Sequence, residues 1–133
     1  MYKEAVRINP RLYQPYLKLA LLYQGKGDRI KAIEYYKKTV SLNPKEPISN
    51  NFLAYDILEH KGDLKKALIM AKTANSVLPG SPAILDTLGL AYFYLGDYDQ
   101  AVMHFLEAYD RNPHNPIIPY HMALAYHKMG RLK

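Results

Sequence analysis

Apolar residues recur along the chain at helical spacing, and glycine and proline interrupt them at regular intervals. Over residues 85–95, leucine and tyrosine stand three or four positions apart, which places them on one side of a helix. A second apolar stripe follows over residues 101–108. Gly96-Asp97 separates the stripes and Asn112-Pro113 ends the second, because proline forces the preceding residue out of the helical conformation. The pattern predicts two helices joined by a short turn. The predicted core positions are Leu85, Leu88, Tyr92, Leu95, Ala101, Phe105 and Ala108.

The same punctuation marks three successive units of 34 or 35 residues. Each unit carries a Gly-Asp pair, an alanine four residues after the aspartate, and a closing proline. The alanine has a physical reason, since two helices joined by a short turn approach closely and a larger side chain would separate them. The chain is therefore predicted to be an array of helix pairs. The Gly-Asp pairs begin at Gly27, Gly62 and Gly96, and the alanines are Ala32, Ala67 and Ala101. The prolines are Pro10, which precedes the first unit, Pro44, Pro79 and Pro113.

These recurring residues resemble the signature of the tetratricopeptide repeat, a unit of two helices. Residues 82–115 match it as Leu85-x2-Leu88-Gly89-x2-Tyr92, Ala101-x3-Phe105 and Pro113. Residues 13–46 match it as Tyr16-x2-Leu19-Ala20-x2-Tyr23, Ala32-x3-Tyr36 and Pro44. Residues 47–80 match less closely and carry one extra residue, expected in the turn at 59–63, which extends the unit to 81. The resemblance implies an all-α fold, a right-handed superhelical solenoid of antiparallel helix pairs.

Both ends of the chain also fit the array. Tyr2 and Ala5 stand where the second helix of a unit has tyrosine and alanine, so residues 1–12 are interpreted as the end of a preceding repeat. Residues 116–133 carry Met122-Ala123-x2-Tyr126 and are interpreted as the first helix of a further, truncated repeat. We therefore expect a single array that is either a fragment of a longer one or a very minimal protein.

The composition indicates one folded array rather than a disordered chain, since 49% of the 133 residues are apolar and 23% are charged. No run of about 18 apolar residues is present, so no membrane span is expected. The first ten residues lack the apolar core of a secretory signal. The absence of cysteine excludes disulfides and thiolate metal sites. It fits a cytoplasmic or a secreted setting, of which the cytoplasmic one is slightly favoured.

The net charge of +6 is unevenly distributed. Residues 1–75 hold 14 Lys and Arg against 7 Asp and Glu, whereas residues 76–133 hold 4 against 5. A basic half can attract nucleic acid by releasing counterions. No recognised nucleic-acid motif and no aromatic-flanked basic loop accompanies it. We interpret the lysines as a solvated helix surface and expect no nucleic-acid partner.

One segment places candidate chemistry on the second helix of the last full unit. His104 and Glu107 form a His-x2-Glu pair, which can supply two metal ligands from one helix. The equivalent outer positions of the other units, Tyr35 and Met70, add no ligand. No His-x3-His pair, phosphate-binding glycine loop, or nucleophile beside a histidine and an acid is present. The sequence predicts a solvent-facing His104, no metal, no cofactor and no catalytic residue.

The resemblance implies a binding groove instead. In tetratricopeptide repeats the first helices line the concave side of the superhelix, which commonly holds an extended peptide or a helix of a partner protein. Chaperone-binding members grip a terminal carboxylate with cations, a mode not expected here. The matching positions are Leu17, Leu21, Asn51, Asp86 and Thr87, almost without cations. The groove residues that the resemblance implies are Gln14, Leu17, Leu21, Gln24, Asn51, Tyr55, Asp86, Leu90, Phe93, Tyr94, Tyr120, Leu124 and His127.

Two other functions stay open at this point. The helix expected from residue 116 to about 129 lacks its usual covering helix, so Met122, Tyr126 and Met129 can present apolar surface. This predicts a self-associating assembly scaffold, a homo-oligomer that forms through its terminal helices. The other function is a docking or regulatory segment of a larger enzyme, because arrays of this kind often flank catalytic domains.

Overall fold

The fold is entirely helical in the part of the chain that the structure describes. The structure is a computed structural model and describes residues 12–131, so the interpretation of residues 1–11 and 132–133 lies outside it. None of the helices in the described range has the length and apolar content that a bilayer crossing needs. These observations confirm the all-α prediction. The helices are α2 (Gln14–Gly25), α3 (Arg29–Leu42), α4 (Pro47–Glu59), α5 (Leu64–Val77), α6 (Pro82–Tyr94), α7 (Tyr98–Arg111) and α8 (Ile117–Arg131).

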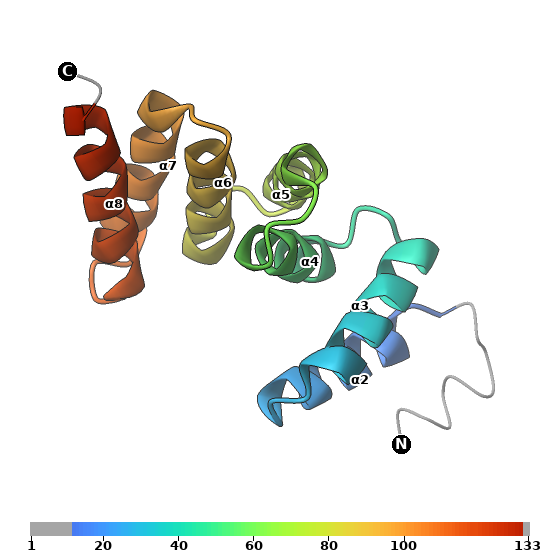
Figure 1. Cartoon of the computed structure of the whole chain (residues 1–133). Coiled ribbons are helices and arrows are strands. Elements are labelled where there is room, and N and C mark those ends of the chain that lie inside the picture. Colours follow the sequence, from blue (N-terminus) through green and yellow to red (C-terminus); the bar gives the residue numbers. More distant parts are fainter. Residues whose placement is uncertain (1–11, 132–133) are drawn as a thin grey trace.

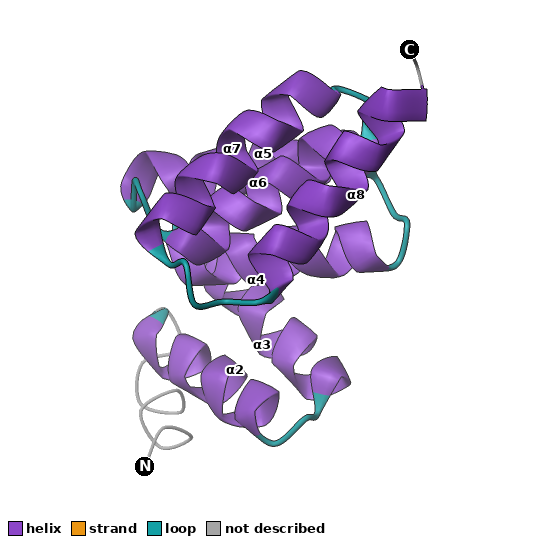
Figure 2. Cartoon of the chain, turned by 90° about the vertical axis from the view of Figure 1, so that its left-hand side faces the viewer, coloured by secondary structure: helices purple, strands orange, loops and turns teal. Residues whose placement is uncertain are grey.

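Consecutive helices form antiparallel pairs. The helix α2 packs on α3, α4 on α5 and α6 on α7, and α8 packs on α7. Figure 1 shows the pairs following one another in chain order, from the blue α2 to the red α8. Short loops connect all the helices, as the perpendicular view in Figure 2 shows. The result is a solenoid, in which each unit contacts mainly its neighbours.

Aspartate caps the second helix of each pair. The carboxylates of Asp28, Asp63 and Asp97 each accept a hydrogen bond from the backbone N–H three residues later, at 3.1, 3.1 and 3.3 Å. Gly27 and Gly96, just before two of these caps, have φ angles of 79° and 88°, a conformation that favours glycine. The recurring Gly-Asp pair is therefore a turn followed by a helix cap.

The turn of the middle pair is one residue longer than the others. Residues 60–63 connect α4 to α5, whereas residues 26–28 and 95–97 connect the other two pairs. In the longer turn Lys61 takes the left-handed conformation, with a φ of 54°. In the other two turns a glycine, Gly27 or Gly96, takes the left-handed conformation, whereas in this turn a residue with a side chain takes it.

Small residues stand where paired helices cross. The alanine of each unit is fully buried there. Phe105 is also fully buried and faces Gly89 so closely that an added Cβ would lie 2.4 Å from its ring. These positions agree with the predicted core, whereas Leu95, the residue after α6, is 38% exposed. The buried alanines include Ala32, Ala67, Ala101 and Ala108.

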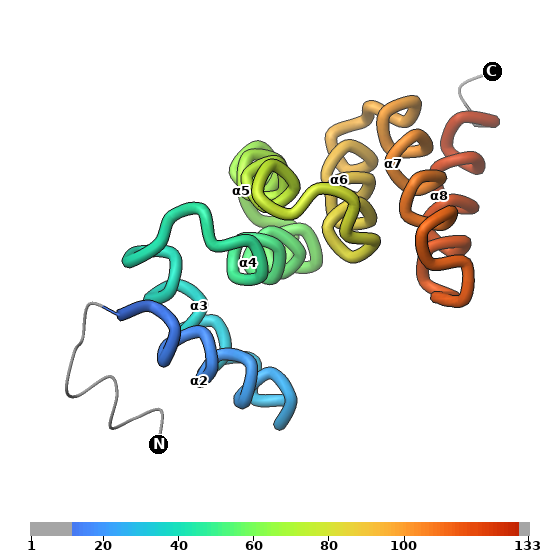
Figure 3. Tube along the Cα trace, turned by 180° about the vertical axis from the view of Figure 1, so that it is seen from behind, coloured from blue at the N-terminus to red at the C-terminus, as the bar shows by residue number. Residues whose placement is uncertain are grey.

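The first pair packs less closely on the second pair than the later units pack on one another. The helix α4 packs against α6, and α6 against α8, but α2 has no comparable packing on α4. Contact between the first two pairs runs mainly through α3 and α4. Figure 3 shows this arrangement from behind, with α2 and α3 set apart from α4 and α5. The side chains at this junction therefore determine where pockets remain between the first two helix pairs.

Candidate functional site

A hollow lies among the first helices of the units. It has a volume of about 390 Å³ and reaches from the end of α2, across α4 and α6, to the start of α8. We call this hollow the groove. Four of the residues predicted for partner binding line it: Gln24, Asn51, Tyr55 and Asp86. The other lining residues are Tyr36, Ile48, Phe52, Ala83, Thr87, Asn115 and Ile117.

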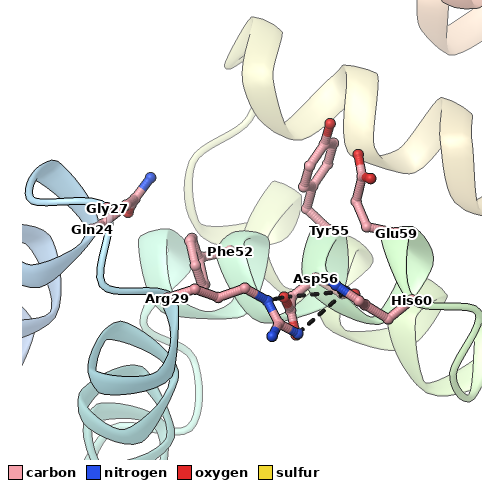
Figure 4. A pocket seen from close by; sticks show the side chains of 8 residues that line it. All are labelled: Gln24, Gly27, Arg29, Phe52, Tyr55, Asp56, Glu59 and His60. Carbon is pink, nitrogen blue, oxygen red and sulfur yellow. Dashed lines mark hydrogen bonds and ion pairs between the residues drawn. The ribbon is translucent and has the colours of Figure 1, made fainter.

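A second hollow of about 300 Å³ adjoins the groove near the C-terminal end of α4 (Figure 4). Gln24, Phe52 and Tyr55 line both hollows. An ion pair forms part of its wall, because the Arg29 guanidinium donates to both carboxylate oxygens of Asp56, at 2.7 and 3.1 Å. The positive charge of Arg29 is therefore paired with the Asp56 carboxylate at the protein surface.

Tyr55 offers an aromatic ring and a protonated hydroxyl between the two hollows. The Glu59 carboxylate stands one turn further along α4. Both side chains point to the same side of the helix in Figure 4. Burial is the main cause that raises the pKa of Tyr55 above its ordinary value, and the neighbouring Glu59 carboxylate raises it further. The hydroxyl consequently stays neutral near physiological pH.

Tyr36 fixes the end of the groove that lies nearest α2. Its fully buried ring stacks on Phe52, with ring centroids 4.4 Å apart. Its hydroxyl donates a hydrogen bond to the side-chain oxygen of Gln24. Burial, with a smaller contribution from the charge of Glu46, raises the pKa of Tyr36 to about 12. The hydroxyl therefore remains a donor, and it orients the Gln24 amide at the groove.

Asn51 brings an unsatisfied polar atom to the groove. Its side chain lines the hollow, and its Oδ1 is buried without a hydrogen-bond partner among the described residues. A buried acceptor that makes no hydrogen bond costs about 1–3 kcal/mol. Rotation of the amide toward the hollow would let a partner's N–H donate to this oxygen and remove that cost.

Asp86 is held by a histidine of α8. The Nδ1 atom of His121 lies 2.9 and 3.0 Å from the two carboxylate oxygens, and both residues are buried. The His121 ring also packs near the rings of Phe105 and Tyr120, with centroids 5.6 and 5.9 Å away. The pair connects α6 to α8 beside the groove, and the charge of Asp86 is met by this neighbour.

The remaining predicted residues do not line the groove. Leu90 differs most from the expectation, because it is 5% exposed and packs in the hydrophobic core. The cause is that α6 is buried over all residues from Ile84 to Ala91, so it has no free side there. Phe93 packs against the same core and against Tyr94, with ring centroids 5.4 Å apart. The others are Gln14, Leu17, Leu21, Tyr120, Leu124 and His127.

The sequence patterns did not indicate several residues that shape these hollows. Arg29 and Asp56 come from different helices, as do Asp86 and His121, so no local spacing joins them. A weaker signal exists for Asp56 and His60, which stand four residues apart on α4 with Nδ1 and Oδ1 separated by 3.5 Å.

The His104 segment makes contacts other than those expected. The sequence predicts a solvent-facing His104, but this residue is half-buried and stacks on Tyr92, with ring centroids 5.2 Å apart. Glu107 pairs with Arg111 on the same helix, at 3.6 Å. Within residues 12–131 there is no group of three or more His, Cys, Asp or Glu that could hold a metal ion. The segment contributes to packing.

Comparison with known proteins adds to this geometry. The family described as "TPR repeat" matches residues 89–130, and the one described as "Tetratricopeptide repeat" matches residues 13–46. The chain belongs to the tetratricopeptide repeat family. The fold is accordingly the right-handed superhelical solenoid of this family, whose arrays are generally modules for protein interaction rather than catalysis.

Relatives and solved structures are similar to this tetratricopeptide array. The cell division cycle protein 27 homolog A of Arabidopsis thaliana is 31% identical over 109 residues, which make up 80% of this chain and only 15% of that protein's length. The structure of MamA is similar with a TM-score of 0.77 at 23% identity, over 97% of this chain and 75% of MamA. YrrB, described as a TPR protein with an unusual peptide-binding site, gives 0.76 at 18% identity, over 98% and 67%. These structures share the fold.

Proposed function

We propose that this array is a non-catalytic interaction module that binds an extended peptide or a helix of a partner protein in the groove. The observation that carries the proposal is Asn51, whose amide oxygen finds no hydrogen-bond partner in the described part of the chain and stands at a hollow lined by aromatic and aliphatic side chains. An extended peptide presents backbone N–H groups along its length, and one of them can donate to this oxygen. The peptide-binding site of YrrB, a protein of the same fold, supports the same class of ligand.

Apolar side chains around Asn51 supply contact area for a partner. Ile48 and Ile117 line the groove and are 43% and 40% exposed. Phe52 and Tyr55 line it as half-buried rings. Aromatic side chains in partly enclosed pockets often contribute a large share of binding energy. We infer that the partner inserts an apolar side chain among these four residues.

The charges of the groove favour a neutral or basic segment. Asp86 is bound by His121, and Arg29 in the adjoining hollow is bound by Asp56. Glu59, an acidic residue, lines that hollow next to Tyr55. Among the described residues that line the two hollows, there is no unpaired Lys or Arg to hold a terminal carboxylate. This supports a partner recognised by backbone and apolar contacts.

Replacing Asn51 and Tyr55 together by alanine is expected to weaken peptide binding by a factor of about ten or more. The change removes both the acceptor for the peptide N–H and an aromatic contact. Peptides selected from a random phage-displayed library against the whole chain provide the ligands, and isothermal titration calorimetry measures their affinity. Helix content by circular dichroism is expected to persist, because both side chains are only half-buried.

Met103→Ala is the matched control, because Met103 is 60% exposed on α7 and lines neither hollow. Its affinity for the selected peptides is expected to equal that of the unmodified chain. Peptides that bind the Asn51 and Tyr55 double variant as tightly as the unmodified chain would contradict the groove as the binding site.

Assembly of identical chains through α8 is a second candidate. Tyr120 and Tyr126 are 58% and 48% exposed on this helix, whereas Met122 and Met129 pack against the core. The tyrosines offer contact surface, although the methionines do not form the uncovered row that the sequence suggests. Multi-angle light scattering is expected to show a mass above that of one chain as concentration rises, and Tyr126→Asp is expected to reduce it. A constant monomer mass would contradict assembly.

A further inference from the structure

A third hollow lies on the side of α4 away from the groove. Its volume is about 590 Å³, and residues of α3, α4 and α5 line it. We call it the α3–α5 cleft. On α4, Leu53 and Ile57 line the cleft, whereas Asn51 and Tyr55 line the groove. Because a step of two residues turns a helix by about 200°, the two pairs face opposite sides of α4.

The cleft combines an apolar floor with cationic borders. Leu53 and Ile57 of α4 and Met70 of α5 line it and pack against the buried core. Lys37 of α3 and Lys66 of α5 line the same cleft from its two walls, and both are exposed. Neither lysine forms an ion pair with another residue in the described part of the chain. An apolar surface is thus flanked by two uncompensated positive charges.

Two rings occupy the corresponding positions in the next unit. Tyr92 stands 35 residues after Ile57, and His104 stands 34 residues after Met70. Their rings stack on each other, with centroids 5.2 Å apart. Where the next unit has two stacked rings, the α3–α5 cleft has one isoleucine and one methionine. The side chains on the floor of the cleft therefore differ in kind from those at the corresponding positions of the next unit.

The corresponding lysine of the next unit already has a partner. Lys72 stands 35 residues after Lys37, and its Nζ lies 5.8 Å from the centre of the Tyr92 ring. Such a contact partly compensates the ammonium charge. Lys37 has no ring contact of this kind among the described residues. The α3–α5 cleft is therefore a hollow whose border lysine, Lys37, lacks within residues 12–131 the ring contact that Lys72 makes.

The cleft is bounded on the groove side by an ion pair. Arg29 and Asp56 line both the α3–α5 cleft and the second hollow beside the groove. Their two hydrogen bonds, drawn in Figure 4, hold the side chains together across the junction of α3 and α4. A ligand in the cleft therefore contacts residues other than Asn51 and Tyr55, so the two sites can be tested separately.

We propose that the α3–α5 cleft binds an amphipathic helix of a partner protein, apolar on one face and acidic along both borders of that face. Ile33, Lys37 and Val40 line the cleft at helical spacing along α3. Together with Arg29 they extend over about 16 Å of helix, roughly the length of three turns. Apolar side chains of the bound helix contact the floor, and its carboxylates pair with Lys37 and Lys66.

Synthetic helices provide a direct probe of this chemistry. The probe is a fluorescein-labelled 14-residue alanine-based peptide with leucine at positions i, i+4 and i+7 and glutamate on both borders. One comparison peptide replaces each glutamate by lysine, and another replaces each leucine by serine. Fluorescence anisotropy with the whole chain is expected to show that the acidic leucine peptide binds tighter than either comparison peptide by a factor of about ten or more.

Two kinds of variant test where this peptide binds. Ile57→Tyr with Met70→His installs the two stacked rings of the next unit, and it is expected to weaken binding about ten-fold or more because the tyrosine ring occupies part of the cleft and the aliphatic floor is lost. Lys37→Glu with Lys66→Glu changes only exposed side chains, so folding is expected to persist while affinity falls by a similar factor. The Asn51 and Tyr55 double variant is expected to bind the acidic peptide as tightly as the unmodified chain.

Three results would overturn the proposal. The first is equal affinity for the acidic peptide with serine in place of leucine, which would show simple charge attraction. The second is unchanged affinity in both the cleft-filling and the charge-reversed variants. The third concerns a short DNA duplex. If the duplex displaces the peptide, and if it binds the cleft-filled variant as tightly as the unmodified chain, the basic surface would be a site for nucleic acid.

Discussion

Replacing Phe105 by alanine is expected to lower the free energy of unfolding by about 3–5 kcal/mol, as for other fully buried phenylalanines. Phe105 has no exposed surface and belongs to a core cluster with members from α4 to α8. The change removes apolar contacts and leaves a cavity, because Gly89 opposite the ring has no side chain that could move into the space. Urea denaturation followed by circular dichroism measures the loss.

Gly89→Ala tests the same contact from the opposite helix. Its Cβ would lie 2.4 Å from a ring carbon of Phe105, so α6 or the ring must shift. Overpacking of this kind costs about 1–3 kcal/mol, which exceeds the gain of about 1 kcal/mol that alanine brings to a helix interior. In the Phe105→Ala background the clash is absent, and the same change is expected to stabilise. The effect of Gly89→Ala should therefore reverse sign between the two backgrounds.

Met103→Ala serves as the control on the same helix. Met103 is 60% exposed, so its loss is expected to change the free energy of unfolding by less than about 1 kcal/mol. A similar loss at positions 103 and 105, or a stabilising Gly89→Ala in the unmodified chain, would contradict the packing of Phe105 against Gly89.

The helix pairs could be predicted from the sequence because their causes are local. Helical spacing places Ala101, Phe105 and Ala108 on one side of α7, and all three are fully buried. The aspartate of each Gly-Asp pair caps a helix through its own side chain, as Asp97 does with the backbone N–H of Gln100. In these cases the residue type at a position directly determines the local backbone conformation or the packing of its side chain.

The groove could be predicted only in part. The position of a residue on a helix fixes the direction of its side chain, but it does not show whether solvent or another helix lies in that direction. Asn51 and Tyr55 line a hollow, since α4 is covered only partly on that side. Leu90 has an equivalent direction on α6, but neighbouring helices surround α6 and bury it. Burial on both sides of one helix is a tertiary property that spacing does not reveal.

The α3–α5 cleft depends on the volumes of side chains that meet across units. The tyrosine of the repeat signature, Tyr92 in the third unit, is replaced by Ile57 at the cleft. Ile57 and Met70 differ from Tyr92 and His104 in shape, and the sequence shows this difference at a fixed spacing. Only the structure shows that the two positions face each other.

Replacing His121 by alanine is expected to lower the free energy of unfolding by about 3 kcal/mol, the upper end of the cost of leaving a buried polar group without its hydrogen-bond partner. His121 and Asp86 have side-chain exposures of only 7% and 9%, and Nδ1 lies 2.9 Å from the carboxylate. Without His121, the Asp86 carboxylate stays buried without its partner on α8. Chemical denaturation measures the loss, and hydrogen exchange is expected to show the largest increase in α8.

His127→Ala is the matched control, because His127 is exposed on the same helix. It is expected to change the free energy of unfolding by less than about 0.5 kcal/mol. Asp86→Leu combined with His121→Phe replaces the pair by apolar groups and is expected to lose less than His121→Ala alone. If His121→Ala unfolds at the same denaturant concentration as the unmodified chain, the pair does not hold α8.

Asp86→Asn separates the stability of α8 from the charge at the groove. Asparagine keeps an oxygen that can accept from the His121 N–H, so the loss of stability is expected to be smaller than for His121→Ala. If the charge of Asp86 contributes to binding in the groove, this variant weakens basic peptides more than neutral ones. If Asp86 acts only by fixing α8, peptide affinity instead falls in proportion to stability across both variants, and the peptide's charge makes no difference.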